Sequence, residues 1–200
     1  MPSIAISRSP VEAPLIDSLW PRASGGALRY AALALAGSLL LWLSAKIQVP
    51  LWPVPMTMQS FVVLLIGAGY GLRLGGATVA LYLAEGALGL PVLAGTPEKG
   101  VGLAYMMGPT GGYLVGFLLA VVAMGRLAER GWLRDWKRGG ALLLIGSAIP
   151  LALGWAWLAT FVGAGKAFAL GVAPFLVGGA VKLALAASLL PLARRAPRPG

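Results

Sequence analysis

The sequence predicts an all-α integral membrane protein, a bundle of six transmembrane helices whose two termini both lie in the cytoplasm. Of the 200 residues, 58% are hydrophobic and only 11% are charged, whereas a soluble domain has about 25% charged residues. A soluble fold of this length still exposes roughly a third of its chain, so it could not bury this much apolar surface. The apolar residues form long stretches rather than short alternating strands, which favours helices over a β-barrel.

Six apolar stretches come close to the roughly 17–25 residues that a helix needs to cross a bilayer. They are 28–45, 57–72, 74–90, 111–128, 140–162 and 172–192. The second and third are short and are joined by the run GLRLGG, so we expect a helical hairpin that turns around Arg73. Pro150 has no backbone N–H to donate and is expected to kink the fifth helix.

The remaining residues divide the chain into a membrane domain and two tails. Residues 1–26 are expected to form a cytoplasmic tail with a short interfacial piece near Ile16, Leu19 and Trp20. This segment has neither the apolar core nor the small-residue cleavage site of a signal peptide. The six helices occupy 27–193, and 194–200 is expected to be a basic cytoplasmic tail.

The basic residues are divided unequally between the two sides of this bundle. An even number of spans places both termini on one side, together with twelve of the 16 basic residues: Arg8, Arg22, Arg29, Arg73, Arg126, Arg130, Arg134, Lys137, Arg138, Arg194, Arg195 and Arg198. Lys46, Lys99 and Lys166 fall on the other side, and Lys182 lies within the last span. Cytoplasmic loops are rich in Lys and Arg, so the termini are predicted to be cytoplasmic. The net charge of +10 then reflects orientation and contact with anionic lipid, and nucleic-acid binding is disfavoured.

Missing residue types exclude several classes of function. The chain contains no Cys and no His, and among its six acids only Glu85 lies within an apolar run. A metal site, a cysteine nucleophile and a pair of intramembrane carboxylates are therefore not expected, and neither is a cofactor. The run GAGKA at 163–167 has Thr160 and Ala167 where a phosphate-binding loop needs Gly and Ser or Thr. We expect no ATPase activity in this chain.

Two loops on the outer side are apolar and rich in Gly and Pro, which is unusual for a solvated loop. These loops, 46–56 and 91–110, are expected to fold back over the bundle and cover a cavity. By contrast, the cytoplasmic loop 126–139 is basic and carries Trp132 and Trp136, as is typical of a membrane interface.

Lys182 is the most informative charge within the membrane. It follows Pro174 by about 12 Å along the last helix at 1.5 Å per residue. A Lys near the bilayer centre costs roughly 2.5–3.5 kcal/mol, so it is expected to face a cavity and suits an anionic or acceptor-rich ligand. Alternatively, Lys182 forms a structural pair with Glu85 or with backbone carbonyls, and Glu85 only extends to the interface.

Aromatic and amide side chains gather on the outer side, as expected for a small-molecule site with an apolar lining and a few polar groups. They are Trp52, Gln59, Tyr82, Tyr105, Tyr113, Trp155, Trp157 and Phe175. Two alternatives remain: Trp155 and Trp157 form an interfacial belt, and Gln59 caps the start of its helix.

Four runs of sequence resemble the BioY family, the biotin-binding membrane subunits (S components) of energy-coupling-factor (ECF) transporters. They are KIQVPLWPVPMTMQSFVVLL (46–65), YLAEGALGLPVLAG (82–95), GPTGGYLVGF (108–117) and PFLVGGAVKLALAA (174–187). The resemblance covers about 45–190, and the combination of PVPMTMQ with GPTGGYLVGF is specific. It implies high-affinity capture of biotin from outside the cell and its uptake across the cell membrane.

The resemblance also implies the site. Lys182 matches a ligand-holding Lys of the family, and the expected biotin-binding set is Lys182, Gln59, Tyr82, Glu85, Gly95, Tyr105, Gly108 and Tyr113, with Trp52 as a loop gate. The chain departs from the family at two positions, because Gly179 stands where many members have Asp and Gly95 stands near a common Asn. Glu85 or a loop carbonyl is the expected replacement acceptor for the ureido N–H groups.

The partners implied are a membrane scaffold subunit and two cytoplasmic ATPases, with docking expected at Ala32 and Ala36 of the first helix. The alternatives are an S component for another vitamin or a biotin precursor, and a biotin transporter that works alone, as a homo-oligomer. An intramembrane enzyme would need a nucleophile or metal constellation that the residues do not offer. A purely structural membrane protein would not need Lys182 and Gln59 beside apolar loops.

Overall fold

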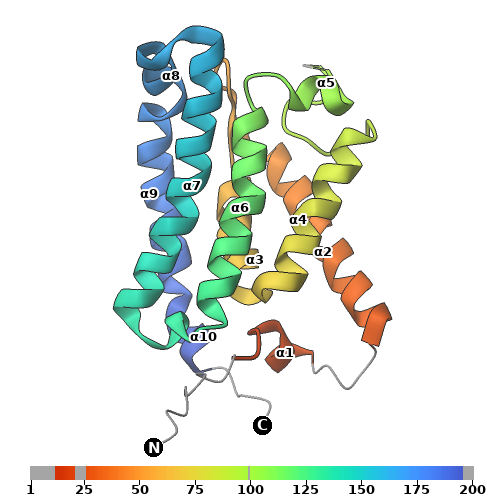
Figure 1. The fold of residues 1–200 in the computed structure, drawn as a ribbon, viewed down its shortest axis with the longest axis vertical. Coiled ribbons are helices and arrows are strands. Elements are labelled where there is room, and N and C mark those ends of the chain that lie inside the picture. The colour runs from red at the N-terminus through yellow and green to blue at the C-terminus, as the bar shows by residue number, and fades with distance from the viewer. Residues whose placement is uncertain (1–11, 21–25, 99, 196–200) are drawn as a thin grey trace, which may run out of the picture.

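The computed structural model describes residues 12–20, 26–98 and 100–195, and these form an almost entirely helical bundle (Figure 1). Six helices make up its body: α2 (Gly26–Lys46), α3 (Gln59–Gly69), α4 (Gly71–Ala87), α6 (Gly111–Ala128), α7 (Trp136–Val162) and α9 (Ala173–Ser188). The predicted all-α membrane bundle is confirmed. Most of the predicted tails, namely 1–11, 21–25 and 196–200, and the residue Lys99 lie outside the described residues.

The helices of the body differ in length. Four helical segments of the described chain are long and apolar enough to cross a membrane: α2, α6, α7 and the run Ala164–Arg194 that includes α9. By contrast, α3 has 11 residues, about 16 Å of helix against a hydrocarbon core of about 30 Å. The reason is local, because the predicted stretch 57–72 begins with Thr57 of the short strand β2 (Met56–Thr57) and its last two residues already belong to α4. Six complete spans therefore remain a prediction.

The hairpin of α3 and α4 turns earlier than predicted. The chain reverses at Tyr70, and Gly71 opens α4 with φ of +74°, a value that Gly adopts without steric cost. Arg73 therefore lies in the first turn of α4 rather than in the turn itself. The Glu129 carboxylate accepts the backbone N–H of Leu72 at 2.8 Å, which satisfies one of the free amides at this helix start.

Close contact between α6 and α7 depends on glycine. A Cβ added to Gly116 would lie 2.5 Å from Cα of Pro150, and one added to Gly112 would lie 2.3 Å from Cβ of Trp157. α7 is continuous from residue 136 to 162 with Pro150 inside it. At its start the Asp135 carboxylate accepts the backbone N–H of Arg138 at 2.9 Å, and this bond lowers the pKa of Asp135.

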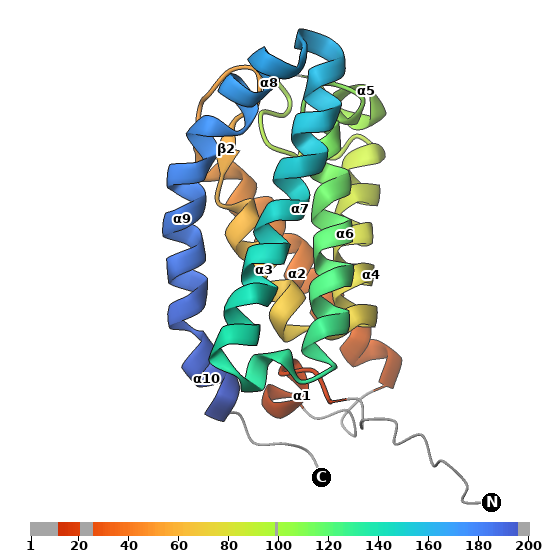
Figure 2. The same cartoon turned by 60° about the vertical axis from the view of Figure 1, so that its left-hand side comes forward.

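The short elements lie at the two ends of the bundle (Figures 1 and 2). The upper end in these views carries α5 (Gly102–Met106) and α8 (Ala164–Gly171). The lower end carries α1 (Ile16–Leu19), the 3-10 turn Trp132–Arg134 and α10 (Leu190–Arg195). α1 is the short piece predicted before the first span.

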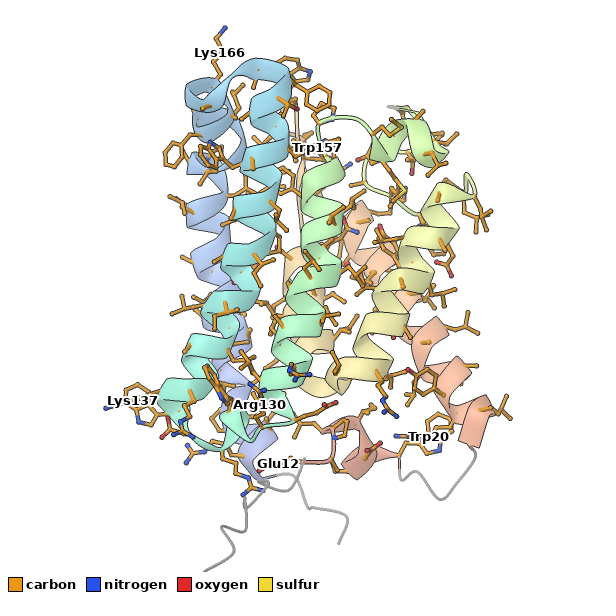
Figure 3. The ribbon with its side chains drawn as sticks, in the orientation of Figure 1. Glu12, Trp20, Arg130, Lys137, Trp157 and Lys166 are labelled. Atoms are coloured by element: carbon orange, nitrogen blue, oxygen red, sulfur yellow. The ribbon has the colours of Figure 1, made fainter. Side chains whose placement is uncertain are left out.

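The charged residues labelled in Figure 3 also lie at the two ends of the bundle. Figure 3 shows Lys166 at the upper end, and Glu12, Arg130 and Lys137 at the lower end with Trp20. The basic-rich lower end is the one that the charge distribution assigns to the cytoplasm.

The loop between α2 and α3 enters the bundle from the upper end. β1 (Gln48–Val49) pairs with β2 in antiparallel register, Gln48 opposite Thr57. Figure 2 shows β2 beside α9 above the start of α3, and a Cβ on Gly178 of α9 would lie 2.3 Å from the sulfur of Met56. This inward path carries polar side chains from the loop to the interior of the bundle.

Candidate functional site

A cavity lies where the inward loop, α3, α6, α7 and α9 meet. Its lining residues are Val54, Pro55, Thr57, Gln59, Ser60, Leu64, Ala94, Tyr105, Thr110, Tyr113, Leu114, Phe117, Gly146, Ser147, Pro150, Leu151, Phe175, Gly179 and Lys182. Its free volume is about 70 Å³, well below the roughly 300–1,000 Å³ typical of small-molecule sites. An occupant the size of a vitamin would therefore need more space than this lining leaves free.

Lys182 supplies the only charge among these lining residues. The side chain is 8% exposed, and its ammonium donates to the Thr57 carbonyl and, at 3.1 Å, to Ser60 Oγ. A Lys ammonium has three donors, so one remains for a ligand. The lining residues include no Asp or Glu, so the positive charge in this cavity has no carboxylate beside it.

Gln59 belongs to a buried hydrogen-bond chain rather than to a helix cap. Its Nε2 donates to the Tyr82 hydroxyl at 2.6 Å, and its Oε1 accepts from Thr57 Oγ1 at 3.2 Å. The Tyr82 hydroxyl donates in turn to the Val92 carbonyl at 3.0 Å. The capping alternative is wrong, because Met58 is the cap residue of α3 and the first backbone N–H of the helix, that of Gln59, is accepted by Thr57 Oγ1 at 3.3 Å rather than by the Gln59 side chain. Tyr82 is fully buried behind Gln59 and does not line the cavity.

The segment 91–96 is fastened from two sides, and it carries Ala94 into the cavity wall. Tyr82 holds Val92 from α4, while Lys46, at the end of α2, donates to the carbonyls of Leu93 at 3.4 Å and Thr96 at 3.1 Å. From the sequence, Lys46 was predicted only to be one of the charges on the outer side. A single Lys at the end of an apolar span, facing an apolar loop, was the available signal of this role.

We predict that Tyr82→Phe lowers the free energy of unfolding by about 1–3 kcal/mol, the cost of leaving buried polar groups unsatisfied. The change removes the acceptor of the Gln59 amide and the donor to the Val92 carbonyl. Thermal unfolding in detergent measures the effect, with Thr160→Val as the control, because this change removes an exposed hydroxyl that lines neither cavity. An unfolding temperature equal to that of the unchanged protein would show that the hydrogen bonds from Gln59 through Tyr82 to Val92 do not stabilise the fold.

Two tyrosines predicted for the site do line the cavity, in different ways. The Tyr113 hydroxyl donates to the Gly171 carbonyl at 2.7 Å, and its ring stacks on Phe175 with centroids 5.8 Å apart. Tyr105 is 7% exposed, and its hydroxyl has no hydrogen-bond partner among the described residues. Both provide aromatic surface beside the polar groups of Lys182 and Gln59.

The structure separates Glu85 from Lys182. The Glu85 carboxylate accepts a hydrogen bond from Ser38 of α2, and Glu85 is not among the lining residues. Of the alternatives for Lys182, the backbone carbonyl partner is the one observed. Gly179 lines the cavity, and a Cβ added there would meet nothing within 4 Å. The position at which the resemblance implied an Asp is thus open space here.

The other predicted residues lie outside the cavity lining. Trp52 is 73% exposed in the loop before β2. Gly95 is adjacent to the lining residue Ala94. The Gly108 carbonyl accepts from Trp157 Nε1 at 2.9 Å, so Trp157 has a specific bond besides any role in an interfacial belt.

Residues that the sequence analysis did not single out supply hydroxyl groups to the lining. They are Thr57, Ser60, Thr110 and Ser147. Thr57 and Ser60 lie close to Gln59 within the run 46–65, and Thr110 lies within GPTGGYLVGF, so their place in these motifs was the sign in the sequence.

The cavity, its single Lys and its Gly- and Pro-rich loops can be compared with known proteins. The model of the BioY family matches residues 17–198. This chain belongs to the BioY family. The resemblance found in the sequence is thereby confirmed, and with the apolar helices it makes the chain a multi-pass membrane protein.

Individual BioY relatives agree with this assignment. A probable biotin transporter BioY of Pyrococcus horikoshii is 43% identical over 142 residues, which covers 71% of this chain and 82% of that protein. The biotin transporter BioY of Thermotoga maritima is 40% identical over 149 residues, covering 74% and 85%. The crystal structure of an S component for biotin from an ECF-type ABC transporter has a TM-score of 0.74 at 20% identity, covering 86% of this chain and 93% of that one. At that identity the likeness shows the shared fold.

Proposed function

We propose that this chain captures biotin on the outer side of the cytoplasmic membrane and takes it up as the S component of an ECF transporter. Membership of the BioY family and the names of its relatives, biotin transporters, support the choice of ligand. The observation that carries the proposal is the buried Lys182 in an apolar cavity that has no lining carboxylate. Such a site favours a ligand that is largely apolar and offers hydrogen-bond acceptors.

The chemistry of biotin matches the groups at this site. Its ureido carbonyl and its carboxylate are acceptors for the remaining donor of Lys182. Its two ureido N–H groups need acceptors, and the hydroxyl oxygens of Ser60, Thr110 and Tyr105 provide them without an acidic side chain. The stacked rings of Tyr113 and Phe175 offer apolar surface for the thioether ring.

Access to the site is governed by the outer loops. The cavity is too small for biotin as it stands, so the ligand enters when the loops 46–56 and 91–110 open. Trp52, exposed in the first of these loops, acts as a gate. In the closed state, the hydrogen bonds from Lys46 and Tyr82 to the segment 91–96 hold that loop over the ligand.

Energy for uptake comes from partner subunits. The resemblance to S components implies a membrane scaffold subunit and two cytoplasmic ATPases as partners, and the lack of a phosphate-binding loop in the sequence agrees with this. The scaffold docks on the outer face of α2, where Ala36 is exposed and Ala32 is half-buried and small side chains permit close helix approach. An assembly of several copies of this chain is the alternative.

A binding measurement on the purified protein tests the ligand. We expect biotin to co-purify with the protein or to bind it at equilibrium, while thiamine and riboflavin compete poorly. Expression in cells starved of biotin should restore biotin uptake. Absence of a bound ligand together with absence of uptake would overturn the proposal, and preferential binding of another vitamin would change the ligand.

A further inference from the structure

A second cavity lies at the lower end of the bundle, at the opposite end from the loops that cover the biotin site. Its volume is about 280 Å³, close to the lower limit of typical small-molecule sites at roughly 300 Å³. The cavity is enclosed by the N-terminal segment and by α2, α4 and the end of α6. Its lining residues are Pro14, Ile16, Asp17, Gly26, Arg29, Tyr30, Tyr70, Arg73, Leu74 and Glu129.

Arg29 is buried in the wall of this cavity with an incomplete set of partners. It is 6% exposed, and one terminal nitrogen donates to Asp17 Oδ1 at 2.6 Å. Its Nε has no hydrogen-bond partner among the described residues. A buried guanidinium is costly unless its donors are paired. The Nε atom itself is not accessible from the cavity, so it is not a contact for a ligand. An anion bound beside this guanidinium would instead offset the cost of its burial through its charge.

Arg73 adds a second guanidinium, from the first turn of α4. In the described part of the chain no carboxylate forms an ion pair with it. The two carboxylates of the lining are already engaged, because Asp17 is bound to Arg29 and Glu129 accepts the Leu72 amide. The hydroxyls of Tyr30 and Tyr70 complete the polar lining.

We propose that this cavity binds a phosphate-bearing group, held by Arg73 and Arg29. Guanidinium forks match the geometry of phosphate oxygens better than any other side chain. The two Arg and the two acids leave the lining formally neutral, which disfavours a dianion and suits the single charge of a phosphodiester. The headgroup of an anionic phospholipid carries that group. The location supports this source, because the cavity lies at the basic end, where Trp20 and Tyr30 are 40% and 38% exposed, like interfacial aromatics.

Native mass spectrometry of the purified full-length protein tests the site, with phosphatidylglycerol and phosphatidylcholine as probes. We expect retained phosphatidylglycerol to fall about tenfold in Arg73→Gln, the loss of one charge-assisted contact. Arg130→Gln is the matched control, because Arg130 is exposed at the same end but does not line the cavity. It should retain the lipid like the unchanged protein. Equal losses in the two variants would overturn the site, and equal retention of both lipids would exclude the anionic lipid as its occupant.

A second arm distinguishes the source of the phosphate. Inorganic phosphate at constant ionic strength is tested for protection against thermal unfolding in detergent. Protection that disappears in Arg73→Gln, without preference for phosphatidylglycerol, assigns the site to free phosphate, whereas preference for the lipid alone assigns it to the membrane.

Arg29→Lys provides an independent check on the buried partner. Lysine keeps the charge opposite Asp17 but lacks the Nε donor and the fork. We expect a folded protein with weaker retention of phosphatidylglycerol. Unchanged retention at an unchanged unfolding temperature would contradict a role for Arg29.

Discussion

Lys182→Ala is expected to weaken the binding of biotin to the purified protein at least about tenfold, because one charge-assisted hydrogen bond in a buried site is lost. The ammonium is the only charge in the cavity lining and has one donor beyond those used by Thr57 and Ser60. Loss of the ammonium leaves the biotin carbonyl or carboxylate without a hydrogen-bond partner, although that group has been removed from water on binding. Equilibrium binding of labelled biotin in detergent measures the change.

The controls separate this ligand contact from the internal bonds of Lys182. Ser60→Ala removes one internal acceptor but keeps the ammonium, so it should cost less affinity than Lys182→Ala. Lys166→Ala removes an exposed Lys at the upper end and should leave binding unchanged. If Lys182→Ala binds biotin as tightly as the unchanged protein, Lys182 is not part of the site.

Gly179→Leu is expected to reduce biotin binding by about ten- to a hundredfold by filling the cavity, the effect of forcing extra methylenes into a packed site. Gly179 lines the cavity, and an added Cβ would meet nothing within 4 Å. The Cβ is therefore accommodated beside α9, and the remaining atoms of the Leu side chain extend into the cavity. The larger side chain then competes with the ligand for the same space.

The neighbouring position offers a matched control for this substitution. Ala180→Leu adds a similar apolar group one residue further along α9, at a position that is exposed and does not line the cavity. It should bind biotin normally. Biotin binding by Gly179→Leu at full affinity would show that the ligand binds elsewhere.

Helix type and approximate position followed from the one-dimensional pattern, because apolar side chains in runs longer than about 17 residues have few stable arrangements other than a membrane helix. The stretch 111–128 coincides with α6. The stretch 57–72 was less accurate, because its first residue, Thr57, belongs to β2 and its last two, Gly71 and Leu72, belong to α4. Apolar composition alone does not distinguish a buried strand from a helix. The turn was predicted around Arg73 but lies at Tyr70. Several glycines in this part of the sequence can form a turn, and composition does not select among them.

Lys182, Gln59, Tyr105 and Tyr113 were predicted for the site and do line one cavity. Each is a polar or aromatic residue at an unusual place in an apolar run, which is a local signal. Glu85 has the same signal but bonds to Ser38 on α2 instead. The choice between Ser38 and Lys182 depends on which helices are neighbours, and that information is not local.

By itself, the sequence determined the class of the protein, its family and the identity of the one charge buried beside the outer loops. Composition and motifs are properties of the linear sequence, so they do not depend on how the helices pack. The tertiary structure alone decided that Lys182 is held by Thr57 and Ser60, that Lys46 and Tyr82 fasten the same loop segment, and that Arg29 is left with an unpaired donor. These facts depend on contacts between residues far apart in the chain, which are set by the packing of helix faces rather than by local preference.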